Sequence, residues 1–165
     1  RVRSSAASDV YKRQLQRSSI MFINVKKLNG KAKLPERATA TSAGADLCAC
    51  IDDDVVLMPG DRKLIPTGLA IAVPTGYGGF VFARSGLSSK FGVSLANCVG
   101  VIDSDYRGEV KISVINHSDE PYTVKNGERI AQLVIMPVDL CEYGLCDELD
   151  DTERGMGGFG STGRM

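Results

Sequence analysis

The chain has 165 residues, about the length of one domain, and 43% of them are apolar and 24% charged. This balance excludes an intrinsically disordered chain, which is less apolar and carries more net charge. Residues 1–20 hold five basic residues and one acidic residue, so residues 21–165, with 15 basic and 19 acidic residues, are mildly acidic. We therefore expect no nucleic-acid partner, and because no apolar run reaches 18 residues, no membrane partner either.

The cysteines predict a reducing compartment. They are odd in number and no secretory signal is recognisable, so we expect free thiols and a cytoplasmic location. The five residues are Cys48, Cys50, Cys98, Cys141 and Cys146. Their spacings are poor for a structural zinc site, and the single histidine, His117, cannot complete the usual ligand sets.

Residues 1–20 are rich in Arg and Ser and have no apolar period. They fit either an organellar targeting peptide or an extraneous extension, and we favour the second because Met21 begins a plausible strand that runs to Val25. The chain then divides into three predicted parts: a disordered extension at 1–20, a β-barrel domain at 21–140 and a mobile C-terminal arm at 141–165.

Residues 21–140 consist of short apolar segments separated by Pro-Gly and Asn-Gly turns. Strands are predicted at 55–57, 69–73, 80–82, 109–114 and 130–136. This rhythm is typical of an all-β sandwich or jelly roll, and only Leu87–Phe91 favours a short helix.

Two of these strands carry more information than the others. Residues 109–114 alternate polar and apolar side chains, as a strand with one covered face does. Residues 130–136 are almost uninterruptedly apolar, which predicts a second sheet on one side and another subunit on the other. Gln132 lies within this run. Its side-chain amide either forms hydrogen bonds with backbone groups in the core or is presented to a ligand or water.

Several polar segments are candidates for binding an anion. Arg84-Ser85-Gly86 precedes the short helix, where a guanidinium and a hydroxyl can converge on phosphate, although such a triplet is also common in surface turns. Gly100–Gly108 places Asp103, Asp105 and Tyr106 in a predicted tight hairpin, where one carboxylate can act as a base and the other form an ion pair; a solvated hairpin tip is the alternative.

The end of the chain changes in composition. Residues 141–153 are acidic and poor in core-forming residues, and residues 154–163 are dense in glycine, so this part is expected to stay mobile until it gains contacts. With Arg154 and Phe159, the glycine-rich tail is a candidate to wrap a polyphosphate, and a flexible linker is the alternative.

Five motifs occur in one order along residues 21–165, and together they resemble the homotrimeric deoxyuridine triphosphate nucleotidohydrolases (dUTPases). They are Ala43–Leu47, Arg84–Gly86, Asn97–Gly108, Gly127–Leu133 and the tail from Arg154 to Gly163. The resemblance implies a jelly-roll barrel of the β-clip type, assembled as a homotrimer. It also implies active sites at the subunit contacts, each closed by a C-terminal arm swapped from another subunit.

The resemblance further implies hydrolysis of dUTP to dUMP and diphosphate by water attacking the α-phosphorus, which lowers dUTP and supplies dUMP for thymidylate synthesis. Asp103 matches the general base and Gln132 a residue that positions the water. The residues implied in substrate binding are Arg84, Ser85, Gly86, Asn97, Gly100, Val101, Ile102, Tyr106, Lys111, Arg154, Phe159, Gly160 and Ser161. The resemblance also implies Mg²⁺, which the substrate phosphates hold, and Asp46 matches an acid that acts near this ion through water. The alternative for Asp46 is a structural role.

Two other functions compete with this interpretation. A dCTP deaminase, or a bifunctional deaminase and dUTPase, has the same trimeric fold but uses a glutamate where water attacks the ring, and it lacks the complete glycine-rich tail. A non-catalytic nucleotide-binding regulatory module is expected to have lost the base or the tail arginine, and both Asp103 and Arg154 are present.

Overall fold

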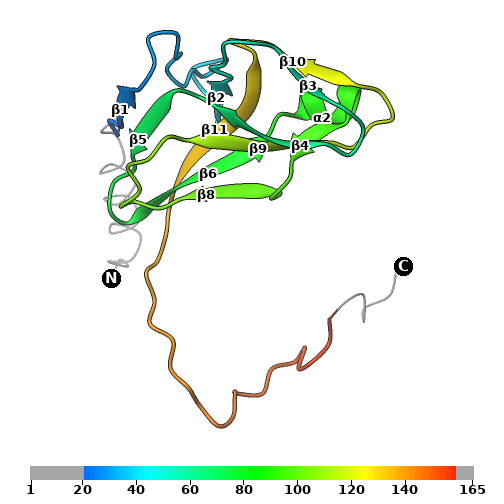
Figure 1. Ribbon diagram of the computed structural model, residues 1–165. Helices are drawn as coiled ribbons and strands as arrows, with labels where there is room; N and C mark the ends of the chain where they lie inside the picture. The colour runs from blue at the N-terminus through cyan, green and yellow to red at the C-terminus, as the bar shows by residue number, and fades with distance from the viewer. Residues whose placement is uncertain (1–20, 159–165) are drawn as a thin grey trace, which may run out of the picture.

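The computed structural model describes residues 21–158, which form a β barrel with a long C-terminal arm (Figure 1). The strands in this part of the chain are β1 (Asn24–Lys27), β2 (Ala45–Cys48), β3 (Val55–Leu57), β4 (Arg62–Pro66), β5 (Leu69–Ala72), β6 (Tyr77–Ala83), β7 (Val93–Leu95), β8 (Val99–Ile102), β9 (Lys111–Asn116), β10 (Tyr122–Val124) and β11 (Arg129–Pro137). The helix described among them is α2 (Ser85–Phe91). The predicted all-β fold is confirmed, and it is a jelly roll.

All strand pairs are antiparallel. One sheet has the order β2-β11-β6-β8 and a second the order β4-β9-β7, while β1 pairs with β5 and β3 with β10. The longest strand, β11, lies between β2 and β6 and joins most of the segments described below as a site. Because β2 and β6 flank it, the ends of these three strands bring residues from distant parts of the sequence together.

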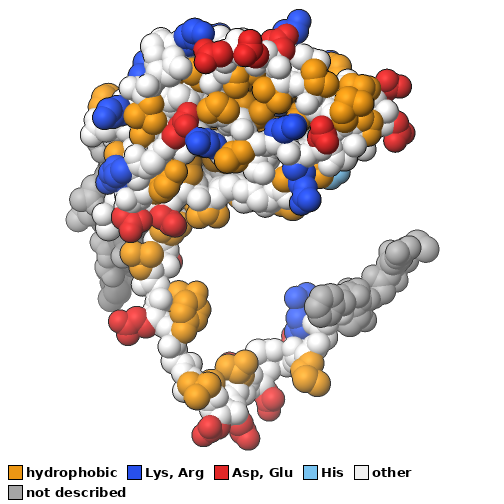
Figure 2. Space-filling model, in the orientation of Figure 1, with side chains coloured by type: hydrophobic (Ala, Val, Ile, Leu, Met, Phe, Trp, Pro, Cys, Tyr) orange, Lys and Arg blue, Asp and Glu red, His pale blue; other side chains and the backbone are white. Residues whose placement is uncertain are grey.

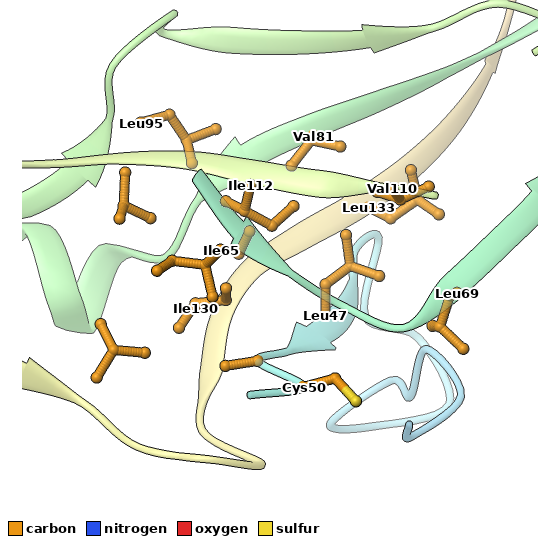
Figure 3. Close-up of a cluster of buried hydrophobic side chains, with 14 of the residues drawn as sticks. Leu47, Cys50, Ile65, Leu69, Val81, Leu95, Val110, Ile112, Ile130 and Leu133 are labelled. Atoms are coloured by element: carbon orange, nitrogen blue, oxygen red, sulfur yellow. The ribbon is translucent and has the colours of Figure 1, made fainter. Parts of the chain in front are cut away.

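The core fills the space between the two larger sheets (Figure 3). Leu47 of β2, Val81 of β6 and Leu133 of β11 meet Ile65 of β4 and Ile112 of β9, and all five side chains are buried. Each such burial stabilises the fold by about 1.5–3 kcal/mol relative to an exposed side chain. The strand β9 alternates exposed and buried residues, as its sequence predicts.

Several strand boundaries differ from the predicted ones. Strand β1 starts at Asn24 rather than Met21, because its partner β5 ends at Ala72, opposite Asn24, shortly before Pro74 turns the chain. The helix begins two residues before the predicted start and ends at Phe91, as predicted. Gly92 follows it with a left-handed φ of 66°, a common way for a helix to stop.

The predicted tight hairpin after Gly100 is wrong. Strand β8 pairs with β6 in one sheet, whereas β9 pairs with β4 and β7 in the other. The connecting residues 103–110 therefore cross from sheet to sheet instead of closing a two-stranded ribbon. Alternation identified the strands but not their partners, and the crossing leaves room for a pocket between the sheets.

Strand β11 is only partly covered within one chain. Ala131 and Leu133 are buried, but Val134, Ile135 and Met136 are half-buried. Val138 is still half-buried, and its amide donates to the Gly76 carbonyl oxygen at 2.9 Å. Residues 139–158 then leave the barrel without forming a helix or strand, and the large apolar side chains among them are exposed (Figures 1 and 2). Within residues 21–158, no helix has the length and apolarity needed to cross a membrane.

Candidate active site

A pocket of about 390 Å³ lies where the chain crosses between the sheets, and we call it the β8–β9 pocket. Seven of the predicted site residues line it: Asn97, Gly100, Val101, Ile102, Asp103, Tyr106 and Lys111. Its other walls include Leu64, Leu95 and Glu109, which the sequence did not indicate. A carboxylate, an aromatic ring, an amide and an ammonium group thus face one space.

The turn after β8 places Asp103 beside Tyr106. The Tyr106 amide donates to the Asp103 carbonyl oxygen at 3.2 Å, which closes the turn. The Tyr106 hydroxyl donates to the Glu109 carbonyl oxygen at 2.9 Å, so the ring folds back over its own segment. The ring contacts Gly108, where no side chain intervenes.

Glu109 anchors the floor of this pocket to the barrel. One of its carboxylate oxygens accepts from the Gly68 amide at 2.9 Å, and the other lies 3.6 Å from the Lys111 ammonium. Gly100 is also shaped by its surroundings, since an added Cβ would lie 3.2 Å from Val81 and 3.6 Å from the Asn97 amide nitrogen. Asn97 and the backbone of β8 are therefore packed closely.

A second pocket, of about 360 Å³, lies at the end of β6, and we call it the Arg84 pocket. It brings together three motifs that are far apart in the sequence. Its lining includes Ala43, Gly44, Asp46, Arg84, Ser85, Gly86 and Gln132. A guanidinium, a hydroxyl and an amide line this open space together with the Asp46 carboxylate.

Asp46 is the centre of an ion-pair network beside this pocket. Its side chain is 13% exposed, and its two oxygens accept from Arg84 Nε at 2.9 Å and Arg129 Nη1 at 3.2 Å. Arg84 also donates from Nη1 to the Arg129 carbonyl oxygen at 3.2 Å. Asp46 therefore holds Arg84 in place, in keeping with the structural alternative, and Arg129 is a member of the site that had no predicted role.

The Gln132 amide bonds to the backbone, as the first of its two interpretations expects, and the side chain also lines the Arg84 pocket. Its Nε2 donates to the Ala83 carbonyl oxygen at 3.0 Å, which fixes the amide. Its Oε1 lies against Gly44, where an added Cβ would approach to 2.6 Å, and it accepts no hydrogen bond from the described residues. The oxygen is thus free to accept from a ligand or water in the Arg84 pocket.

The predicted base and the predicted water-positioning residue do not meet within one chain. Gln132 pairs with Phe82 on β6, whereas Ile102, next to Asp103, pairs with Gly79. At about 3.3 Å per residue and 4.8 Å per strand, these positions are about 13 Å apart along the sheet and about 10 Å across it. No residue lines both pockets. The β8–β9 pocket and the Arg84 pocket are therefore separate within one chain.

Of the predicted C-terminal site residues the structure describes Arg154, which lines neither pocket. Arg154 is exposed on the arm, and its carbonyl oxygen accepts from the Gly157 amide at 3.0 Å. Phe159, Gly160 and Ser161 lie outside the described residues. Between residues 21 and 158, no group of three or more His, Cys, Asp or Glu side chains is arranged to hold a metal ion.

Burial is the largest cause of the shifted pKa values of two side chains, Tyr122 and Cys48. Burial raises the pKa of Tyr122, and so does the hydrogen bond of its hydroxyl to Glu128, the residue before β11. Burial also raises the pKa of the Cys48 thiol on β2. All five cysteines are free, and Cys48 and Cys50 are buried.

The fold and its pockets define the class of the protein. The protein is a jelly-roll barrel with one pocket lined by a carboxylate, an aromatic ring and an amide, and another lined by a guanidinium and a hydroxyl. Residues 30–163 match the family model dUTPase, and the chain belongs to the dUTPase family.

Curated relatives agree with this membership. The deoxyuridine 5′-triphosphate nucleotidohydrolase of Desulfitobacterium hafniense is 59% identical over 132 residues, covering 79% of this chain and 87% of the relative. The enzyme of the same name from Syntrophotalea carbinolica is 52% identical over 141 residues, covering 86% of this chain and 96% of the relative.

Solved structures agree as well. The dUTPase of Staphylococcus bacteriophage 80alpha with dUPNHPP is 34% identical and has a TM-score of 0.78, with coverage of 86% of this chain and 98% of that one. A mutant dUTPase from phage phi11 of S. aureus, in which a structural Mg(II) ion is coordinated, is 29% identical and has a TM-score of 0.70, with coverage of 78% and 98%.

Proposed function

We propose that this chain hydrolyses dUTP to dUMP and diphosphate, which lowers dUTP and supplies dUMP for thymidylate synthesis. The observation that carries the proposal is the β8–β9 pocket, in which Asp103, Tyr106 and Asn97 face a space of about 390 Å³. Membership of the dUTPase family and its likeness to a dUTPase structure with a dUTP analogue support it.

Asp103 is the general base in this proposal. Its carboxylate accepts a proton from a water molecule, and the resulting nucleophile attacks the α-phosphorus while diphosphate leaves. A positioned base of this kind contributes about 10²–10⁴-fold to the rate. Gln132 orients the same water through its free Oε1, while the Ala83 carbonyl oxygen holds the amide nitrogen.

Base and sugar selection follow from close packing in the β8–β9 pocket. Backbone groups of Gly100, Val101 and Ile102 read the uracil edge together with the Asn97 side chain. A thymine methyl group would have to be forced into a packed wall at a cost of about 1–3 kcal/mol. Tyr106 lies under the deoxyribose, where a 2′-hydroxyl would collide with the ring.

The phosphates bind in the Arg84 pocket. Arg84 and Ser85 supply charge-assisted and neutral hydrogen bonds, and Gly86 lets the backbone approach closely, since nothing lies within 4 Å of an added Cβ there. Lys111, held by Glu109, contacts the substrate from the neighbouring pocket. The Asp46 carboxylate keeps Arg84 aligned.

A homotrimer completes the site in our proposal. The two pockets of one chain are too far apart to serve one water molecule, so the β8–β9 pocket of one subunit must face the Arg84 pocket of another. The half-buried end of β11 supplies apolar surface for such a contact, and Leu140, Tyr143, Leu145 and Leu149 on the arm are at least 81% exposed in the single chain.

The arm closes the site from a further subunit. Arg154 then adds positive charge at the γ-phosphate, Gly160 and Ser161 donate hydrogen bonds to phosphate oxygens, and Phe159 stacks over the base. Such closure excludes water other than the nucleophile and completes the phosphate cage.

Mg²⁺ is the proposed cofactor. The described residues offer no protein cage for it, and this suits an ion that prefers oxygen ligands, keeps several waters and is held mainly by the substrate phosphates. Asp46 retains lone pairs that can accept from metal-bound water beside its two arginine partners. When bound, the ion neutralises phosphate charge.

The compartment follows from the thiols. All five cysteines are free, including the exposed Cys98, Cys141 and Cys146, so we propose a reducing compartment and place the enzyme in the cytoplasm.

Pyrophosphate release from dUTP, dCTP, dTTP and UTP, together with an ammonia assay on dCTP, tests the function. We expect turnover of dUTP alone and no ammonia. Asp103→Asn should lower the rate by about 10²–10⁴-fold. The matched control is Asp105→Asn, an exposed carboxylate two residues away that does not line the pocket. Ammonia from dCTP, or equal rates in both variants, would exclude the proposal.

A further inference from the structure

We propose that Gly108 sets the sugar selectivity of the enzyme by leaving room for the Tyr106 ring. The inference rests on the proposed function, because it concerns the same pocket, and it assigns a positioning role to a residue that does not itself line the pocket. Gly108 would act only through Tyr106.

The contact between the two residues is unusually close. A Cβ built on Gly108 would lie 2.6 Å from Tyr106 Cζ and 2.9 Å from Cε2, and it would also overlap the hydroxyl oxygen. Real Cβ atoms almost never approach heavy atoms within 3.0 Å. Any side chain at position 108 therefore displaces the ring.

Backbone conformation does not explain the glycine. Gly108 is absent from the glycines with positive φ, so an alanine fits its backbone without strain. The backbone conformation at position 108 therefore does not require glycine. The Tyr106 ring is what excludes a side chain.

The hydroxyl end of the Tyr106 ring occupies the space beside Gly108. The hydroxyl donates to the Glu109 carbonyl oxygen at 2.9 Å, and it lies where a side chain at residue 108 would begin. Tyr106 is 44% exposed, so a displaced ring can move into solvent without opening the core. A side chain at 108 should therefore disturb the pocket and leave the barrel folded.

Either displacement reduces the preference for dUTP over UTP. If the ring swings out, the surface that rejects a 2′-hydroxyl is lost, and kcat/KM for UTP rises. If the ring moves inward, it enters the deoxyribose space and dUTP loses binding, while UTP is already poorly bound. One misplaced carbon in a close contact changes selectivity about 10-fold or more.

The test compares kcat/KM for dUTP and UTP in the full chain and in Gly108→Ala. We expect the selectivity ratio to fall about 10-fold or more, with an unchanged melting temperature. The matched control is Gly30→Ala, since nothing lies within 4 Å of a Cβ at Gly30. An unchanged ratio in folded Gly108→Ala overturns the inference.

A double-mutant cycle separates a direct effect from one through the ring. Tyr106→Ala should already have lost the preference for dUTP over UTP. Adding Gly108→Ala to it should change the ratio of the two kcat/KM values no further. A second, equal loss in the double variant contradicts the inference. Absence of dUTP turnover by the wild-type chain would instead refute the proposed function, so the two failures are distinguishable.

Discussion

Replacing Asp46 by asparagine isolates the network that holds Arg84. The wild-type carboxylate accepts from Arg84 Nε at 2.9 Å and from Arg129 Nη1 at 3.2 Å, with its own side chain 13% exposed. Asparagine keeps one acceptor oxygen, but its NH₂ group faces a guanidinium donor. One charge-assisted bond is therefore lost and the other becomes a neutral-acceptor bond.

The magnitude follows from these two contacts. A hydrogen bond to a charged group contributes about 1.5–3 kcal/mol, and the Arg129 contact is discounted because that side chain is 56% exposed. Asp46→Asn should therefore cost about 2 kcal/mol, which lowers the melting temperature by about 4–8 °C. With Arg84 no longer aligned, kcat should fall as well.

Thermal melting and steady-state kinetics at several Mg²⁺ concentrations provide the assay. The matched control is Asp52→Asn, because Asp52 also accepts from a cation, Lys31 at 2.8 Å, but both side chains are more than half exposed. We expect no resolvable change there. If both variants melt alike, or if Asp46→Asn alters only the Mg²⁺ requirement, the reasoning from the arginine network is refuted.

Three further outcomes are expected. Gly44→Ala should lower kcat about 10-fold or more, because the added Cβ would lie 2.6 Å from Gln132 Oε1 and displace it. Steady-state rates on dUTP check this, and an unchanged kcat would contradict it. The pKa of Tyr122 is raised in the folded chain, so above about pH 10 this tyrosine ionises first in the unfolded chain. The free energy of unfolding should therefore fall as the pH rises, and it should fall less steeply in Tyr122→Phe. Equal slopes of the free energy against pH, measured by urea titrations, would argue against this. A thiol reagent should modify three cysteines in the native protein and the buried Cys48 and Cys50 only after unfolding, as counted by mass spectrometry; early modification of either would show that the pair is accessible.

Several residues that line the β8–β9 pocket were singled out from sequence because they lie close together in the chain. Asn97, Asp103 and Tyr106 lie within ten positions of one another, so one connection between strands brings them to one wall. The predicted hairpin was nevertheless wrong, because the period of a strand identifies its faces and not its partner.

Contacts between distant segments were not predictable in the same way. Arg129 reaches Asp46 across 83 positions, and Glu109 reaches the Gly68 amide across 41. Nothing in the local pattern of either residue indicates its partner, since only the pairing of β11 with β2 and the crossing between sheets bring them together. Gly108 ends one of the five motifs, but its contact with Tyr106 was not indicated, because that contact depends on the direction in which the neighbouring ring points.

The central claim is that the Asp103 and Arg84 pockets of different subunits form one site. Mixing two inactive variants, Asp103→Asn and Arg84→Gln, and copurifying the mixed oligomers through different tags tests it most directly. In a trimer that contains both variants, one of the three subunit contacts joins an intact Asp103 pocket to an intact Arg84 pocket, so activity should return to about one third of wild type. Mixed oligomers that remain inactive would mean that each chain forms its site alone.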